Sequence, residues 1–438
     1  MSSVLAAPTE RPESVTIVGS GIAGLVVAAG LHPAARITVY EAADWIGGHA
    51  HTVDVDDGGR RLAIDTGFIV ANDWTYPRFL ALLARLGVAT QPAAMSFSLQ
   101  HEVSGLEYAG TDALALFAQR RNLVSPSFWR MLIDIVRFNR DARRALEGAV
   151  EEDVTLGEWL AARGYGPALA EHYLVPMGRA IWSAGAAALL GFPARFFIEF
   201  FLRHGLLSIN DRPEWRAVVG GSREYVKALA APFRAHIRLA TPVLAVERRP
   251  GEVQVTTRHG VEHHDAIVFA CHADTALALL GDPSRAEREI LGSFPFQANE
   301  AVLHTDERLL PRARAARAAW NYHLRRDPGA RCAVTYDMNV LQSLATARRY
   351  LVSLNLGDRI DPGAVLARFD YDHPVYSPAV VRAQRRHGEI SGVRRSFYAG
   401  AYWRHGFHED GVVSAETVLG QFAAWREGHA ERALSRLG

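Results

Sequence analysis

The pattern of apolar and polar residues opens with a short β-branched run, a glycine-rich turn and an apolar helix. Val15–Val18 has the composition of a fully buried strand, and the helical pattern that follows Gly19–Gly24 continues to about Leu31. A second apolar strand, Ile37–Tyr40, ends at Glu41. This order of strand, turn, helix and strand predicts a βαβ unit with a parallel sheet, and therefore an α/β fold.

The glycines of this turn have the spacing of a dinucleotide-binding turn. Gly19 permits the tight bend, Gly21 lets the backbone approach a pyrophosphate, and Gly24 lets the helix pack close to the strand. The helix that starts with Ile22 and Ala23 offers free N–H groups and a partial positive charge to the phosphate. The carboxylate of Glu41 can accept hydrogen bonds from two ribose hydroxyls. We therefore expect a dinucleotide at this turn.

Beyond Glu41 the pattern predicts two kinds of region that alternate along the chain. Thr52–Asp56 and Arg61–Ile64 read as a hairpin, and Tyr76–Leu86 reads as an amphipathic helix. From about residue 95 the apolar and polar pattern predicts strands and then a helix-rich stretch. Strand patterns return between residues 237 and 270. We expect a discontinuous nucleotide-binding domain formed by residues 14–95, 218–299 and 378–438, with a substrate domain formed by residues 96–217 and 300–377.

The most apolar part of the chain, Ala184–Leu207, predicts a helix with one broad phenylalanine face. The residues on that face are Phe192, Phe196, Phe197, Phe200 and Phe201. Ordinary core packing accounts for such a face. The alternative is the lining of an apolar substrate channel or a membrane-touching lip, and Phe196, Phe197 and Phe200 are then the candidates for substrate contact.

A second candidate for a substrate wall lies between residues 300 and 377. This stretch is dense in aromatic, amide and acidic residues, including Trp320, Tyr336 and the run Phe369–Pro374. Polar groups set into an apolar wall would give this composition, and so would buried tyrosines whose hydroxyls bond to neighbours. Trp320 and Tyr336 are therefore candidates for contact with the substrate.

Composition narrows the chemistry and the setting. The net charge of +1 gives no indication of a nucleic-acid partner, and Lys227 is the single lysine among 48 lysine and arginine residues. Two cysteines fit a reducing compartment and predict neither a disulfide framework nor a metal site. Residues 1–14 lack the features of a signal peptide, and no uncharged apolar run is long enough to span a membrane. We expect a disordered start and a cytoplasmic protein, with peripheral contact at the inner membrane as an option.

A second glycine pair points to FAD as the dinucleotide. Gly47 and Gly48 follow Glu41 closely, and at this point the chain resembles the flavin-containing amine oxidase superfamily, whose pattern here is E-x3-R-x-G-G-R. In this chain Trp45 and His49 replace the two arginines. The resemblance implies FAD, which we expect to bind without a covalent link, and it adds Gly47, Gly48 and His49 to the cofactor site.

The resemblance also implies the fold and further cofactor contacts. The expected architecture is a Rossmann-type FAD-binding domain with an inserted α+β substrate domain, as in the amine oxidases and p-hydroxybenzoate hydroxylase. The Asp65-Thr66-Gly67-Phe68 turn would lie beside the isoalloxazine, and Val243 would hold adenine through its backbone. A closing strand, glycine loop and helix, expected from Val413, would hold the ribityl chain and the flavin carbonyl. Its assigned residues are Gly400, Glu409, Asp410, Gly411 and Val412.

At a finer level the chain resembles one bacterial group of predicted NAD/FAD-binding proteins. Stretches such as 41–52, 65–77 and 400–415 carry this likeness, with Trp45 and Arg404 standing where arginine and glycine are usual. Members often neighbour cyclopropane-fatty-acid synthase-like methyltransferases, which implies lipid modification.

Three functions follow as hypotheses. The first is an FAD-dependent oxidoreductase that desaturates, oxidises or isomerises an apolar, fatty-acyl substrate. The second is a flavin amine oxidase acting on a small amine, although a chain with one lysine is poorly supplied for the usual lysine–water bridge. The third is a non-catalytic flavoprotein partner of a lipid methyltransferase. The candidates for proton transfer or substrate contact at the flavin are His49, Tyr402, Trp403, His405 and His408.

Overall fold

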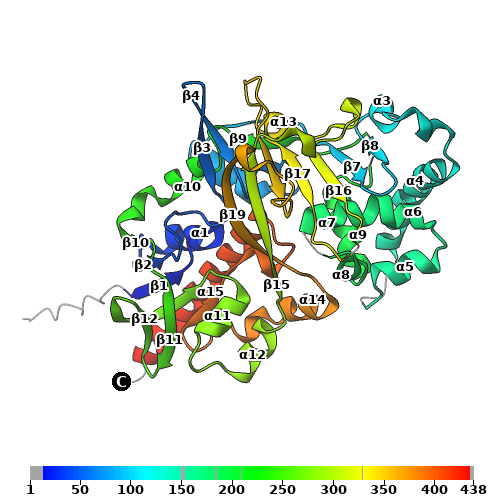
Figure 1. Ribbon diagram of the computed structural model, residues 1–438. Coiled ribbons are helices and arrows are strands. Elements are labelled where there is room, and N and C mark those ends of the chain that lie inside the picture. Colours follow the sequence, from blue (N-terminus) through cyan, green and yellow to red (C-terminus); the bar gives the residue numbers. More distant parts are fainter. Residues whose placement is uncertain (1–12, 149–152, 183–184, 209, 328, 435–438) are drawn as a thin grey trace, which may run out of the picture.

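A five-stranded parallel sheet organises the nucleotide-binding part of the molecule (Figure 1). The computed structural model describes residues 13–148, 153–182, 185–208, 210–327 and 329–434, so the expected disordered start lies almost wholly outside the described residues. The strands, in spatial order, are β10 (Ile237–Arg238), β2 (Arg36–Tyr40), β1 (Ser14–Val18), β14 (Ala266–Phe269) and β20 (Ser396–Tyr398). The predicted βαβ unit is confirmed.

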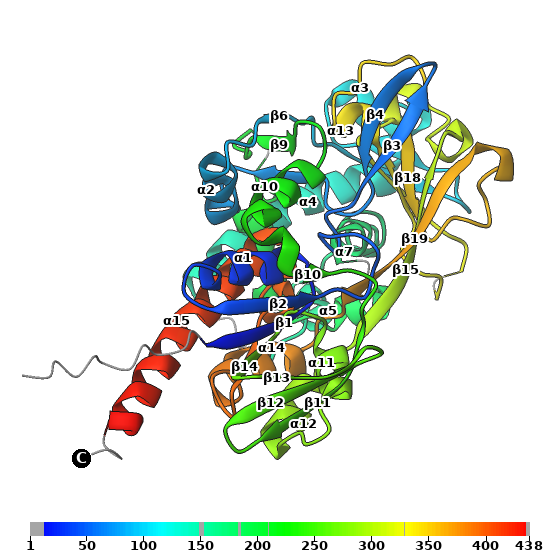
Figure 2. The ribbon, with the colours of Figure 1, turned by 90° about the vertical axis from the view of Figure 1, so that its left-hand side faces the viewer.

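Both faces of the parallel sheet are covered, as its continuous apolar strands require. Val15 and Ile17 pack toward α1 (Ile22–Leu31) and α15 (His408–Leu434), which lie against each other. Val18 and Phe269 face the other way, toward an antiparallel meander and α11 (Ala273–Leu279). The strands of the meander are β11 (Val243–Arg249), β12 (Glu252–Thr257) and β13 (Gly260–His264). Figure 2 shows α1 and α15 together beside the sheet.

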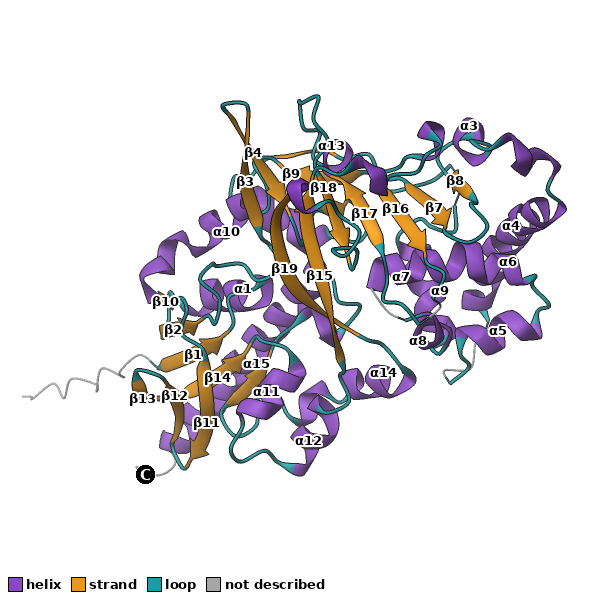
Figure 3. Ribbon diagram, viewed as in Figure 1, coloured by secondary structure: helices purple, strands orange, loops and turns teal. Residues whose placement is uncertain are grey.

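A seven-stranded mixed sheet is the second large sheet of the molecule. In spatial order its strands are β19 (Val365–Pro374), β15 (Phe296–His304), β18 (Leu351–Leu354), β17 (Val334–Asp337), β16 (Trp320–Leu324), β7 (Phe97–His101) and β8 (Glu107–Ala109). All neighbouring pairs are antiparallel except β16 and β7. The long strands β15 and β19 extend from this sheet toward the parallel sheet (Figure 3), so their ends carry side chains to the junction of the two parts.

Two small sheets link the five-stranded and the seven-stranded sheets. The predicted hairpin is confirmed as β3 (Thr52–Asp57) and β4 (Arg60–Asp65). The other sheet consists of β5 (Val70–Asn72), β9 (Trp215–Val218) and β6 (Thr90–Pro92). Asp65 ties them together, because its carboxylate accepts hydrogen bonds from the Thr52 hydroxyl and the Ser222 N–H and hydroxyl.

A helical region covers the outer end of the seven-stranded sheet (Figure 1). Its helices are α3 (Ala113–Leu116), α4 (Pro126–Glu147), α5 (Leu156–Ala162), α6 (Pro167–Leu169), α7 (Val175–Trp182), α8 (Ala186–Leu190) and α9 (Ala194–Arg203), with a 3₁₀ turn, η1 (Arg120–Val124), before α4. Thr155 and Glu158 form a reciprocal capping box at α5, as their spacing predicts. The phenylalanine-rich segment becomes α9, preceded by Phe192.

The remaining helices lie around the nucleotide-binding part and on the edge of the larger sheet. They are α2 (Pro77–Arg85), α10 (Arg223–Ala230), α12 (Arg285–Leu291), α13 (Met338–Leu341) and α14 (Pro378–Arg385). Within the described ranges, no helix has the length and apolar character needed to cross a bilayer.

Candidate flavin and substrate site

The glycine-rich turn between β1 and α1 is shaped by two kinds of constraint. Gly19 has φ +104°, and a Cβ there would lie 2.7 Å from the Ala270 carbonyl oxygen; a Cβ on Gly24 would lie 2.0 Å from the Gly19 carbonyl oxygen. These two glycines are therefore required by the fold itself. A Cβ on Gly21 would meet nothing within 4 Å. The fold leaves open space at the position where a pyrophosphate is expected to approach.

The second glycine pair lies against this turn. The Gly47 N–H donates to the Ser20 carbonyl at 3.1 Å, and Gly21 and Gly47 form a parallel bridge. A Cβ on Gly48 would lie 3.3 Å from the Gly21 Cα atom. The two glycine motifs, separated by more than twenty residues in the sequence, thus border one space.

Glu41 lies at the end of β2 beside the same turn. Its Oε2 accepts hydrogen bonds from the Ser20 N–H at 2.8 Å and the Ser20 hydroxyl at 2.6 Å, and its Oε1 accepts from the Ala43 N–H at 2.9 Å. The Glu41 carbonyl accepts from the Thr241 N–H, which lies two residues before Val243 at the start of β11. The structure therefore brings Glu41 and Val243 to the same end of the parallel sheet.

The closing helix meets the first helix at this site. It begins at His408, five residues earlier than the expected Val413. A Cβ on Gly411 would lie 2.7 Å from the Ile22 Cγ2 atom, so the first turns of α15 and α1 are in contact. The Gly400 N–H donates to the Ser414 hydroxyl at 3.0 Å, which fixes the end of β20 against α15. Val412 is buried in the core between these helices.

The two acids of this helix have side-chain partners within the protein. The Glu409 carboxylate accepts the N–H groups of Arg78 and Phe79 at 3.2 and 2.9 Å, which caps the N-terminus of α2. Asp410 accepts the Phe407 N–H at 3.0 Å, and burial raises its pKa to about 6. Both carboxylates therefore shape the loop and the helix starts around the expected cofactor position, and the assignment of Glu409 and Asp410 to the cofactor stays a prediction.

The Thr66–Phe68 turn rests on the backbone of His49. The Phe68 N–H donates to the His49 carbonyl at 2.7 Å, and a Cβ on Gly67 would lie 2.2 Å from that oxygen. The Thr66 hydroxyl bonds to the Tyr371 hydroxyl at 2.8 Å. These contacts join the expected flavin turn to the end of β19.

His49 lies at the centre of a buried group of rings contributed by distant segments. Its ring centroid is 5.0 Å from Tyr371, 5.5 Å from His373 and 6.3 Å from His272. Burial, reinforced by His373, His272 and His408, lowers the pKa of His49 far below its usual value. Its Nε2 atom is buried and has no hydrogen-bond partner in the protein. This group of rings therefore contains an uncharged imidazole with a buried nitrogen that has no hydrogen-bond partner in the protein.

Its neighbours are held in place by β15. Asn299 Nδ2 donates to His373 Nδ1 at 3.3 Å, and His272 stacks on Phe296 with the centroids 4.3 Å apart. Burial, with His272 nearby, lowers the pKa of His373 to about 4. Sequence reasoning noted the run that contains Tyr371 and His373 but did not assign them, and it missed Asn299 and Phe296, because only strand pairing brings β15 and β19 to His49.

The remaining predicted catalytic residues separate into different surroundings. His408 bonds to the Tyr225 hydroxyl at 2.9 Å and stacks on Phe68 at 3.7 Å, so its ring is buried in packing, and its catalytic role stays a prediction. Tyr402 and Trp403 both pack edge-on against Phe294, at 5.1 and 5.0 Å. His405 Nε2 and the Tyr376 hydroxyl are buried without a hydrogen-bond partner.

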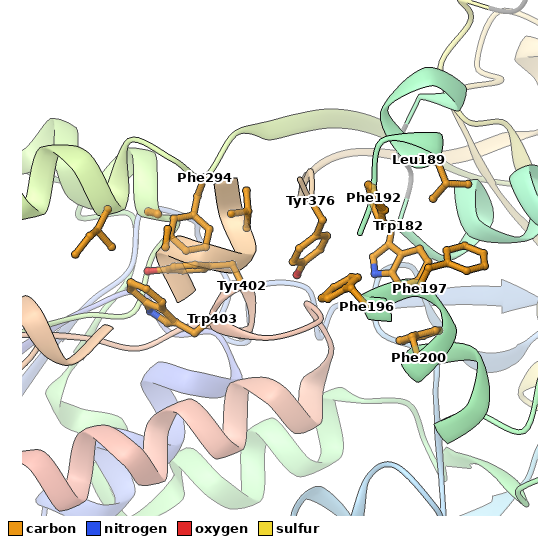
Figure 4. Close-up of a cluster of buried hydrophobic side chains, with 14 of the residues drawn as sticks. Trp182, Leu189, Phe192, Phe196, Phe197, Phe200, Phe294, Tyr376, Tyr402 and Trp403 are labelled. Carbon is orange, nitrogen blue, oxygen red and sulfur yellow. The ribbon is translucent and has the colours of Figure 1, made fainter. Parts of the chain in front are cut away.

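The phenylalanine face lies directly against the loop that follows β20. Phe196 stacks on His405 at 4.5 Å and Phe200 stacks on Phe407 at 5.2 Å. Figure 4 shows Phe192, Phe196, Phe197 and Phe200 gathered around Trp182, with Tyr376 between them and the Phe294–Tyr402–Trp403 group. Phe197 has no exposed surface and stacks on Phe201 at 4.1 Å. Core packing therefore accounts for Phe197, whereas Phe196 borders the two unpartnered polar atoms.

Trp320 and Tyr336 lie away from His49, and their substrate assignment stays a prediction. Their rings pack edge-on at 5.0 Å on β16 and β17. Through β18, Tyr336 is in register with Leu303, seven residues along β15 from Phe296. Tyr371 of the ring group pairs with Asn299, four residues from Leu303, so at about 3.3 Å per residue the separation along the strand is roughly 13 Å.

The residues present fit an FAD. Gly21 leaves room for a pyrophosphate, Glu41 lies beside the same turn, where a ribose is expected, and His49 directly follows Gly48, which lies against that turn. Cys271 also lies near the turn, because its N atom would be 3.3 Å from a Cβ on Gly19. Burial raises the pKa of its thiol to about 12, so the sulfur is uncharged at neutral pH.

Comparison with known proteins gives a consistent result. The family model described as flavin containing amine oxidoreductase matches residues 22–418. AofH of Mycobacterium tuberculosis, which is named as a flavin-containing monoamine oxidase, is 27% identical to this chain over 293 residues. That alignment covers 61% of this chain and 59% of AofH, so the chain spans less than two thirds of this relative.

Two solved structures share the fold over nearly the whole chain. A fatty acid isomerase from P. acnes, described as CLA-producing, superposes with a TM-score of 0.69 at 16% identity and covers 94% of this chain and 98% of its own. Cyclohexylamine oxidase from Brevibacterium oxydans superposes with a TM-score of 0.68 at 15% identity and covers 96% of this chain and 100% of its own. The Rossmann-type α/β fold with an FAD-binding and a substrate-binding part is thereby confirmed.

Proposed function

Because the chain belongs to the flavin-containing amine oxidoreductase family, we propose that this FAD-dependent oxidoreductase acts on an apolar molecule with a fatty-acyl chain. Bound FAD supplies a two-electron acceptor that can take a hydride from a C–H bond beside a double bond. The residues of the chain must then bind an apolar substrate, exclude water and hold one proton.

The observation that carries this proposal is the contact between the phenylalanine face and the loop after β20. Phe196 and Phe200 stack on His405 and Phe407, within the segment that leads into α15. An apolar wall therefore borders the part of the chain that closes the cofactor site. A hydrocarbon substrate gains about 0.8 kcal/mol for each methylene it buries against such a wall.

The imidazoles around His49 are uncharged. Burial lowers the pKa values of His49, His272 and His373, which makes all three imidazoles neutral near pH 7. A neutral imidazole has a free lone pair that can accept the proton released when a C–H bond is oxidised, although its lowered pKa makes it a weak base. We assign this role to His49, because its Nε2 has no hydrogen-bond partner in the protein. His373 lies beside His49, and Asn299 donates a hydrogen bond to His373.

Amine oxidation is the second candidate, favoured by the name of the mycobacterial relative and by the Phe294–Tyr402–Trp403 rings, which could surround an amine. The single lysine does not support it. Lys227 lies on α10 with 63% of its side chain exposed, and its Nζ is 2.9 Å from Glu224. The lysine–water bridge expected of many amine oxidases has no residue to form it.

Anaerobic mixing of the FAD-loaded protein with candidate substrates separates the two functions. We expect unsaturated or cyclopropane fatty acids to bleach the flavin, or to be isomerised with transient bleaching, and primary amines to have no effect. Mass spectrometry of the products distinguishes oxidation from isomerisation. Lys227→Met serves as the control and should retain its rate within about threefold, because loss of a general base costs 10²–10⁴-fold. Bleaching by amines alone, lost in Lys227→Met, would establish the amine oxidase.

A further inference from the structure

Exposed apolar side chains gather on α4 and the segment before it. Fourteen large hydrophobic residues are exposed among the described residues, and six of them lie between residues 114 and 136. They are Leu114, Leu123, Val124, Trp129, Ile133 and Val136, with Val124 81% and Ile133 61% exposed. Single exposed apolar residues are ordinary, but a contiguous group marks an interaction surface. We call these six residues the outer stripe.

The helix α4 presents apolar residues on two opposite faces. Phe128, Met131 and Phe138 are buried on its inner face. Trp129, Ile133 and Val136 follow at i, i+4 and i+7, which places them on one line along the outer face. The inner face accounts for the packing of α4 on the protein, so the outer stripe is not needed for the fold.

The outer stripe is held as one surface. The Trp129 Nε1–H donates to the Leu123 carbonyl at 2.9 Å, which fastens η1 to α4. The Trp129 ring also lies 5.4 Å from that of Phe117, in the turn after α3. Leu123 and Val124 are therefore fixed beside the line formed by Ile133 and Val136.

The charge around the outer stripe is positive. Residues 113–147 contain seven arginines against three carboxylates, whereas the whole chain has a net charge of only +1. Arg120 lies between Leu114 and Leu123 and Arg140 lies four residues beyond Val136; both are exposed, and Arg140 also pairs with Asp141. Apolar residues with tryptophan, bordered by arginines, are the composition of a helix that lies in the interface of an anionic bilayer.

We propose that the outer stripe docks the protein on a membrane surface that contains anionic lipid. A second copy of the chain fits this surface less well, because a two-fold contact would bring the arginines of both copies together. The stripe lies at the end of the molecule far from the parallel sheet (Figure 1), so docking leaves the nucleotide-binding part in water. The proposal does not depend on the identity of the substrate. It replaces Ala184–Leu207 as the expected membrane contact, since the phenylalanines of that segment are buried.

Sedimentation of the FAD-loaded full chain with lipid vesicles tests the proposal. We expect binding to phosphatidylcholine vesicles that contain phosphatidylglycerol, weaker binding to phosphatidylcholine alone, and a decrease between about 0.1 and 0.5 M salt. The double variant Ile133→Gln, Val136→Gln should bind at least about tenfold more weakly, because two apolar side chains no longer leave water. Arg120→Gln, Arg140→Gln should lose mainly the preference for anionic lipid.

The control replaces exposed apolar residues outside the stripe. Leu244→Gln, Val261→Gln on the β11–β13 meander should bind vesicles within about twofold of the parent, and flavin content and melting temperature verify that every variant is folded. Equal vesicle binding by the stripe variant and the parent would overturn the proposal. So would a parent that binds no vesicles, or a stripe variant whose only change is from dimer to monomer in light scattering.

Discussion

The Glu41 carboxylate and Ser20 are joined by two hydrogen bonds, from the Ser20 N–H at 2.8 Å and from its hydroxyl at 2.6 Å. The acid at the end of the second strand is thus attached to the middle of the glycine-rich turn. One carboxylate both shapes the turn and stands where the ribose of FAD is expected, and these two tasks can be separated by mutation.

Glu41→Ala should weaken FAD binding about ten- to a hundredfold, because a charge-assisted hydrogen bond contributes roughly 1.5–3 kcal/mol. Glu41→Gln should have a smaller effect. Ser20→Ala is the matched control: it removes the hydroxyl bond to Glu41 and a long contact from the Gly47 N–H at 3.4 Å, and it should change the affinity by no more than a few-fold. Titration of the apoproteins with FAD measures all three. A Glu41→Ala protein with unchanged affinity would show that another residue holds the ribose.

The FAD should be released completely by acid precipitation. Cys271 lies beside the glycine-rich turn, but its buried thiol has a pKa raised to about 12 and is not the thiolate that nucleophilic attack requires. Cys332 is fully buried. All yellow colour should appear in the supernatant, and Cys271→Ala should behave identically. Flavin retained in the pellet by the parent but not by Cys271→Ala would show a covalent bond.

Phe196 and Phe197 should respond differently to truncation. Phe197 is completely buried, so Phe197→Ala should cost about 3–5 kcal/mol of stability and lower activity on all chain lengths alike. Phe196 lies on His405 and Tyr376, beside two unpartnered polar atoms, so Phe196→Ala should act selectively on long acyl chains. Melting temperature and turnover with short and long substrates should be measured together. If both variants lose stability and lose activity equally on short and long substrates, the whole phenylalanine face is ordinary core packing.

The buried ion pair of Arg248 and Glu287 should make stability depend on acid. Burial by itself raises the pKa of Glu287, but Arg248, the Tyr398 hydroxyl and the Ser284 N–H outweigh it and lower the pKa to about 2. The stabilisation is complete above the unfolded value of about 4.5 and is lost as the pH falls toward 2.

Glu287→Gln should therefore lose about 3–5 kcal/mol at pH 7, because Arg248 is left buried without this partner. The difference from the parent should shrink between pH 4.5 and the lowest pH at which both proteins fold. Thermal melting across this range measures it, with Glu247→Gln, whose side chain is 57% exposed, as control. A difference that does not change with pH would mean that the loss comes from packing.

The sequence by itself determined the features that depend on neighbouring residues. The βαβ unit up to Glu41, the hairpin between Thr52 and Asp65 and the capping box of Thr155 and Glu158 all follow from periodicity, glycine geometry or hydrogen bonds within a few residues. Such features are encoded locally, because their energies come from contacts that the chain makes in any context.

Tertiary structure alone decided which residues share the site. His49 meets His373 more than three hundred residues away because β15 and β19 pair and extend to it, and Cys271 reaches the glycine-rich turn because β14 pairs with β1. The Glu409 carboxylate caps α2, more than three hundred residues away in the sequence, a contact that no local pattern reveals. Long-range pairing and burial select these partners, and only the folded chain brings them within hydrogen-bonding distance.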